Sequence, residues 1–180
     1  VIQNNDITPF RVPIFSFLEQ KGFVLFDNIP YDRIVEAYNE CYIKDSRVLI
    51  QANLDLLHIL KAYDELKMSD NLKKSKLIIG VAQSLAEWLL ENERDNSMIA
   101  IHQLNILQII KRQRNFTESE VNLLLQLSQN DSDMVKAGAF LLLDKLDVAQ
   151  FVIQQFPEDV KARFMNFPIA IFAKVPNCCN

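Results

Sequence analysis

Glycine is scarce in this chain of 180 residues, which contains only Gly22, Gly80 and Gly138. Tight β-turns and phosphate-binding loops use glycine because it adopts positive φ angles at little steric cost. The shortage therefore argues against a β-rich fold and against a P-loop. Leu, Ile, Ala, Gln, Glu and Lys are abundant instead, and these residues favour helices.

Cysteine is also rare and odd in number, with Cys41, Cys178 and Cys179 as its three positions. Three cysteines, two of them adjacent, do not form a disulfide framework, so a reducing cytosol is the expected compartment. The first residue is Val1 rather than Met, which leaves open that the chain is a fragment of a larger protein. An activity could then lie in a part outside these residues.

Long apolar runs and excess positive charge are both absent. No apolar segment approaches the roughly 20 residues that a membrane-spanning helix needs, so no membrane partner is expected. The net charge of −4 argues against general affinity for nucleic acid or anionic membranes, although a local basic patch stays open.

Histidine is limited to His58 and His102, and no second histidine or cysteine lies at metal-ligand spacing from either. No nucleophile motif or glycine-rich nucleotide loop occurs. We expect His58 on the surface and His102 partly buried with one satisfied nitrogen. The acids Glu91, Glu93 and Asp95 lie in a turn, where solvated carboxylates are expected. The sequence thus predicts no catalytic residue, no cofactor and no metal ligand, and a complete active site is not expected.

Apolar residues recur with a helical period nearly everywhere after Pro30. The expected helices cover about 30–43, 46–66, 69–91, 97–113 and 117–128. Ser69 or Asp70 is expected to cap the third of these helices, and Thr117 with Glu120 has the spacing of a capping box. Before Pro30, five of the twelve phenylalanines fall within residues 10–26. They indicate a lid over the first core helix or, alternatively, a contact surface for a partner.

The segment 137–160, "AGAFLLLDKLDVAQFVIQQFPEDV", raises the question of one long helix or two. One helix would place Asp144, Lys145 and Asp147 among large aliphatic residues. A break near Asp144 and Lys145 avoids this and lets Asp147 or Asp144 cap a second helix. We therefore predict a helical hairpin, followed by a helix that Pro157 opens.

The hairpin has small residues, Ala137 and Ala149, where its two helices must approach, and larger residues between them at Phe140, Ile153 and Phe156. This spacing resembles a tetratricopeptide repeat, as does the proline after the second helix. Asp133 and Lys136 depart from the family, which usually has an aromatic residue and a leucine there. The ending "VKARFMNFPIAIF" also looks like the C-terminal helical regions of uncharacterised bacterial proteins. The resemblance implies a helical interaction module in a bacterial cytosol.

The predicted fold is all-α: an irregular stack of antiparallel helical hairpins, similar to a tetratricopeptide solenoid, with a short aromatic-rich N-terminal segment. Residues 1–28 are expected to form the N-terminal arm and aromatic lid. Residues 29–173 are expected to form the helical-repeat domain, and 174–180 a flexible tail. Trp88, Phe140 and Ala149 are predicted to be buried.

Two basic clusters are the only candidate site. If helices 69–91 and 97–113 are antiparallel neighbours, the clusters lie at the same end of the stack, where they could bind an anion or a partner. Glu118 and Glu120 lie near the second cluster and could pair with it. The candidate residues are Lys73, Lys74, Lys76, Lys111, Arg112 and Arg114.

A protein–protein interaction or scaffold module is the function that this sequence favours, with a protein as its partner. One alternative is a nucleic-acid-binding or nuclease-associated module that uses the basic end. Another is an accessory domain of a multidomain enzyme.

Overall fold

This computed structural model describes residues 35, 38 and 48–173. Within these residues 81% are helical and no strand occurs, so the all-α prediction is confirmed. The predicted N-terminal arm and lid (1–28) and the predicted tail (174–180) lie outside the described residues. The helices are α3 (Val48–Met68), α4 (Leu72–Asn92), α5 (Asn96–Gln113), α6 (Glu118–Leu127), α7 (Asp133–Leu142), α8 (Leu146–Gln154), α9 (Glu158–Phe164) and the 3-10 helix η2 (Pro168–Ala173).

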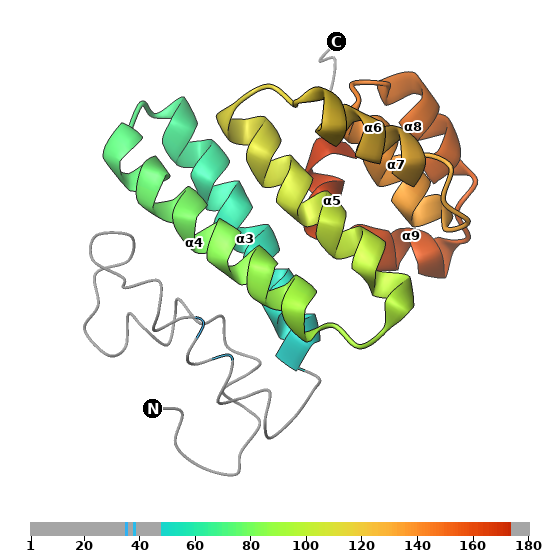
Figure 1. The fold of residues 1–180 in the computed structure, drawn as a ribbon, viewed down its shortest axis with the longest axis horizontal. Coiled ribbons are helices and arrows are strands. Elements are labelled where there is room, and N and C mark those ends of the chain that lie inside the picture. The colour runs from blue at the N-terminus through green and yellow to red at the C-terminus, as the bar shows by residue number, and fades with distance from the viewer. Residues whose placement is uncertain (1–34, 36–37, 39–47, 174–180) are drawn as a thin grey trace. The chain divides into compact units, whose positions relative to one another are not determined.

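The chain divides into two compact units, one ending at Asn92 and the other beginning at Glu93. In the first unit, α3 and α4 form an antiparallel hairpin (Figure 1). Leu56, Leu60, Ile78 and Leu85 are fully buried in this unit. Trp88 is buried as predicted, and its ring lies 5.3 Å from that of Tyr38.

The α3–α4 turn uses Asp70 in a way that differs from the prediction. Its φ angle is 59°, and the amide of Asn71 donates to the Leu66 carbonyl at 3.0 Å. Asp70 therefore ends α3 in the left-handed conformation, which Asp tolerates better than most residues. The predicted cap of the next helix, Ser69 or Asp70, is wrong, because the side chain of Asn71 accepts from the Lys74 amide.

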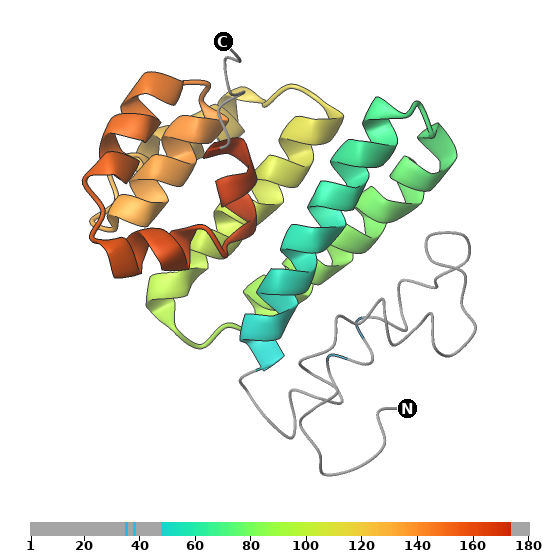
Figure 2. The ribbon, with the colours of Figure 1, turned by 180° about the vertical axis from the view of Figure 1, so that it is seen from behind.

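The second unit is built around α7, which contacts α5, α6, α8 and η2. Figure 2 shows this group of helices from behind. Gly138 allows the close approach: a Cβ atom there would lie 2.7 Å from Leu104 Cδ1 and 3.1 Å from Ile169 Cγ1. The core also contains Leu124, Ala149, Phe156 and Phe164.

The segment 137–160 forms two helices, α7 and α8, as predicted. The amide of Lys145 donates to the Phe140 carbonyl at 2.9 Å, and Asp144 has a φ of 59°. Asp144 therefore ends α7. Lys145 is the N-cap residue of α8, and Asp147 lies in the first turn of that helix. The prediction that Asp144 or Asp147 caps α8 is wrong, because Asp144 adopts the left-handed conformation at the end of α7 and Lys145 is the N-cap residue of α8.

The burial predicted for the hairpin is right for Ala149 and wrong for Phe140. Ala137 and Ala149 are fully buried, whereas Phe140 is only partly buried against the same core. Pro157 stands at the N-cap of α9, and the rings of Phe156 and Phe164 meet edge to face at 5.5 Å. At α6 the capping box of Thr117 and Glu120 is present, which confirms that prediction.

Candidate binding surfaces

The six predicted basic residues fall in different units. Lys73, Lys74 and Lys76 occupy the first two turns of α4, in the first unit. Lys111, Arg112 and Arg114 lie at the C-terminal end of α5, in the second unit. That the two clusters form one patch stays a prediction, and each cluster is described here within its own unit.

Lys111 joins the end of α5 to the end of α7. Its Nζ donates to the Leu142 carbonyl at 2.8 Å and to Asp144 Oδ2 at 2.8 Å. The same ammonium lies 5.7 Å from the centroid of the Phe116 ring. The carbonyls at the end of α7 lack helical partners, so a cation placed there satisfies one of them and also matches the helix dipole. Folding of the second unit therefore accounts for Lys111.

Arg112 and Arg114 also have partners in their own unit. Arg112 donates to Gln108 Oε1 at 3.0 Å, and its guanidinium lies 4.7 Å from the centroid of the Phe172 ring. Arg114 makes two parallel hydrogen bonds of 2.8 Å with the carboxylate of Glu120. The expected pairing of the cluster with a nearby acid is thus confirmed for Glu120.

The Arg114 guanidinium and the Thr117 amide both donate to the Glu120 carboxylate. Hydrogen bonding to Arg114, followed by that to the Thr117 backbone, lowers the pKa of Glu120 from 4.5 to about 2. The charged form is the one that accepts these bonds, so the shift has the sign expected for a paired carboxylate. The pair closes the turn between α5 and α6.

The lysines of α4 lie beside two exposed apolar side chains. Met68, the last residue of α3, is 89% exposed, and Leu72, the first residue of α4, is 60% exposed. Lys67, Lys73 and Lys76 around them are also exposed. We refer to residues 67–76 as the hairpin tip.

A second exposed apolar surface lies on α8. Phe151 is 65% exposed and Val148 is 43% exposed, and their spacing of three places them side by side on the helix. The opposite side of α8 carries Ala149, which is fully buried in the core. We refer to Val148 and Phe151 as the α8 outer face. Sequence reasoning missed it, although helical spacing places Phe151 opposite the Ala149 side.

A row of polar residues on α5 is buried: His102, Asn105 and Gln108 are fully enclosed. His102 was predicted to be partly buried and is instead fully buried. Its Nε2 lies 2.8 Å from Glu93 Oε2, and its Nδ1 has no hydrogen-bond partner among the described residues, so the prediction of one satisfied nitrogen is confirmed. Glu93 was expected to be solvated, but its side chain is only 9% exposed because it pairs with His102. His58 is exposed as predicted. Both side chains of the His102–Glu93 pair are largely enclosed, and the pair joins the turn before α5 to the helix itself.

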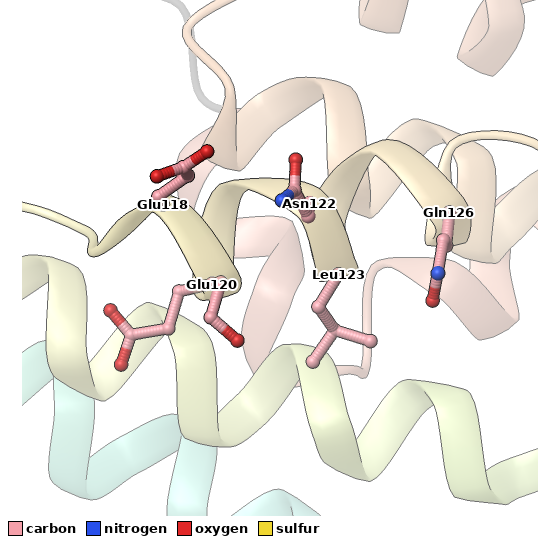
Figure 3. Close-up of a pocket in the computed structure, with 6 residues that line it drawn as sticks. Glu118, Glu120, Asn122, Leu123 and Gln126 are labelled. Carbon is pink, nitrogen blue, oxygen red and sulfur yellow. The ribbon is translucent and has the colours of Figure 1, made fainter.

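A recess runs along α6 (Figure 3). Glu120, at its start, already binds Arg114 and the Thr117 amide. Figure 3 shows Glu118 and Asn122 pointing to a different side of the helix from Leu123. The lining therefore does not converge on one point, as a ligand pocket requires. The lining residues are Glu118, Ser119, Glu120, Asn122, Leu123 and Gln126.

Comparison with protein-family models, curated proteins and solved structures finds no match to this chain. Among the described residues, no group of three or more His, Cys, Asp or Glu side chains could hold a metal ion. None of the helices in 48–173 is both long and apolar enough to cross a membrane. The physical features of the surfaces therefore carry the functional argument.

Proposed function

We propose that this chain is a protein–protein interaction or scaffold module that binds its partner through the α8 outer face. One observation carries the proposal. Phe151 projects from a helix whose other side is held against the core by the fully buried Ala149 and the partly buried Ile153. The core holds α8 in place without using Phe151, so the ring is presented in a fixed position.

Burial of this ring by a partner would stabilise a complex. A phenylalanine side chain buries on the order of 150–250 Å², and apolar burial is worth about 25 cal/mol per Å². Phe151 is 65% exposed, so burial of the rest of its surface makes about 2–4 kcal/mol available at most. Aromatic anchors of this kind concentrate binding energy at protein interfaces, whereas they are not enriched on surfaces that contact only water.

The α7–α8 hairpin supports a further part of the proposal, which is that the helices are arranged as in tetratricopeptide repeats. Ala137 and Ala149 are both fully buried, as the resemblance implies for the positions where two helices approach. Helical stacks of this class present side chains on rigid elements and need no catalytic pocket. A bacterial cytosol as the compartment belongs to the same proposal and rests on the resemblance and the cysteine count.

The test compares two substitutions on α8. Phe151→Glu removes the anchor, and Gln154→Glu, at another exposed position of the same helix, is the matched control. Because Phe151 is not part of the core, Phe151→Glu should change the free energy of unfolding by less than about 0.5 kcal/mol. Proteins captured by the wild-type chain and by Gln154→Glu, but lost with Phe151→Glu, are then purified and titrated by calorimetry.

Loss of the phenylalanine should weaken such a complex at least tenfold, since more than about 1.4 kcal/mol is removed. Equal affinity of all three proteins for every captured partner would overturn the proposal. So would a large loss of folding stability in Phe151→Glu, because the ring would then be needed by the fold itself.

The nucleic-acid alternative gains no support from the contacts described above. Lys111, Arg112 and Arg114 each have a partner within the second unit. Each phosphate contact would have to compete with those partners. The alternative therefore depends on the α4 lysines.

A further inference from the structure

The hairpin tip combines exposed apolar side chains with exposed lysines. Met68 and Leu72 flank the turn at the end of the α3–α4 hairpin (Figure 1). They are among the most exposed large apolar residues that the structure describes. Neither helix uses them in its core.

The backbone of the tip is held by hydrogen bonds. The Asn71 amide donates to the Leu66 carbonyl at 3.0 Å, and the Asp70 amide donates to the Lys67 carbonyl at 3.3 Å. On the other side, the Asn71 side chain accepts from the Lys74 amide at 3.3 Å. These bonds satisfy the ends of both helices, so Met68 and Leu72 are presented on an ordered turn.

The positive charges at the start of α4 are opposite in sign to those that its helix dipole favours. Its first turn contains no acid and includes Lys73, although the positive end of a helix dipole favours acids there. Lys76 and Lys67 are also exposed, and Asp70 is the one acid within residues 67–76. Four lysines against one acid make the tip basic in a chain whose net charge is −4.

We propose that the hairpin tip docks on an anionic phospholipid surface. Met68 and Leu72 enter the boundary between headgroups and acyl chains, while Lys67, Lys73 and Lys76 contact the phosphates. Met68 and Leu72 are largely exposed at the end of a helical hairpin, which suits insertion into a deformable lipid surface better than burial in a preformed protein pocket. Lysine is a point charge on a flexible stem, so it suits a diffuse anionic surface without fixed geometry.

Nucleic acid fits the same tip less well. A phosphate backbone would use the lysines but would leave Met68 and Leu72 in water. The overall acidity of the chain is compatible with lipid binding, because charges beyond a screening length of about 8–10 Å contribute little at physiological salt. The contact is peripheral, so it requires no membrane-crossing helix. It revises the expectation of no membrane partner at this one surface.

The binding should be weak and reversible. A lysine near an anionic lipid surface contributes about fivefold in affinity. Three exposed lysines and two apolar side chains together resemble one of the two signals that stable membrane anchoring usually requires.

The experiment is sedimentation of the full chain with vesicles of phosphatidylcholine, with and without phosphatidylserine. Binding is expected only with phosphatidylserine, and it should decrease as salt is raised. Met68→Ser with Leu72→Ser should weaken binding at least tenfold, as should Lys73→Glu with Lys76→Glu. Lys161→Glu, an exposed substitution on α9 in the second unit, is the charge control and should bind like the wild type.

Asp70→Asn provides a gain-of-binding test. Asparagine accepts the left-handed conformation that position 70 requires, and the substitution removes the only acid of the tip. Binding to phosphatidylserine vesicles should therefore increase severalfold.

Three outcomes would overturn the proposal: no binding to phosphatidylserine vesicles at low salt, equal binding to phosphatidylcholine alone, or unchanged binding by the Met68 and Leu72 variant. Binding to poly-L-glutamate but not to vesicles would assign the tip to an acidic protein instead. Phe151→Glu should leave vesicle binding unchanged, so this test and that of the α8 outer face fail separately.

Discussion

At the scale of single residues, two aspartates show how one residue type serves opposite ends of a helix. Asp70 and Asp144 both have a φ angle of 59° and both end the preceding helix. Asp is equally favourable as a cap at the start of a helix, which is the role that the sequence predicts for both. The left-handed conformation depends on where the two helices pack, so local sequence does not distinguish the two roles.

Gly138 is the residue at which space is most restricted. An alanine Cβ there would press on Leu104 and Ile169, although the better helix propensity of alanine offsets part of that cost. Gly138→Val adds two more carbon atoms where Leu104 and Ile169 are fully buried. We expect it to lower the free energy of unfolding by about 1–3 kcal/mol, measured by urea denaturation.

The control for Gly138 is Lys136→Val on the same helix. Lys136 is only partly buried and makes a 3.1 Å ion pair with Asp133 near the surface. Loss of this ion pair in Lys136→Val should lower the free energy of unfolding by less than about 1 kcal/mol. Equal destabilisation by both substitutions would show that α7 does not approach α5 and η2 as closely as described.

Glu120 gives a prediction for the dependence of stability on pH. Its pKa is about 2 in the folded chain and 4.5 as the reference for an unpaired carboxylate. A lowered folded-state pKa adds stability above the reference pKa, and this stability is lost as the pH falls toward the folded value. The difference in urea midpoint between the wild type and Glu120→Gln should therefore shrink between about pH 4.5 and pH 2.

Glu118→Gln is the control for this effect, because Glu118 lies on the same turn of α6 and is exposed. At neutral pH, the difference in urea midpoint between the wild type and Glu118→Gln should be smaller than the difference for Glu120→Gln. If the difference for Glu120→Gln is the same at both ends of the pH window, Arg114 does not hold the charged carboxylate in solution.

At the scale of elements, the α7–α8 hairpin is the part whose packing the sequence predicts best. Ala149 is fully buried among the side chains of the second core. Ala149→Arg would place an unpaired charge and a long side chain in that contact, which should cost at least about 3 kcal/mol. Urea denaturation followed by circular dichroism measures the loss.

Gln154→Arg introduces the same side chain at an exposed position of α8 and should leave stability nearly unchanged. Comparing the two variants separates the effect of the position on stability from the effect of the arginine side chain itself. Wild-type-like unfolding of Ala149→Arg would mean that α8 does not pack through this side.

At the scale of the whole molecule, hydrophobic periodicity was enough to predict an all-α chain and the approximate helix limits. The reason is that the spacing of nearby apolar residues decides both whether a segment is helical and which of its side chains face the core. Trp88 and Ala149 are two side chains whose burial was predicted in this way. Side-chain pairs that form across turns were harder to predict from the sequence. The bond between His102 and Glu93 joins residues nine apart around a bend, and spacing alone did not indicate it. The exposed Phe151 was missed because the predicted packing of the hairpin concerned only the side of α8 that carries Ala149 and Ile153.

The candidate site was predicted less completely than the fold. Charge clusters can be read from a sequence, but the partners of individual charges depend on tertiary packing. Lys111, for example, meets Asp144 and the Leu142 carbonyl, both more than thirty residues away. The α4 lysines belong with Met68 and Leu72 because the hairpin turn brings them together, and periodicity gave no reason to group apolar and basic residues.

The central claim is that the core fixes α8 while its outer face binds a protein partner. Calorimetric titration of a captured partner against the wild type, Phe151→Glu and Gln154→Glu tests it most directly. Phe151→Glu should bind at least tenfold more weakly, while Gln154→Glu and the wild type should bind equally and all three should unfold alike. Equal affinity of Phe151→Glu and the wild type would contradict it.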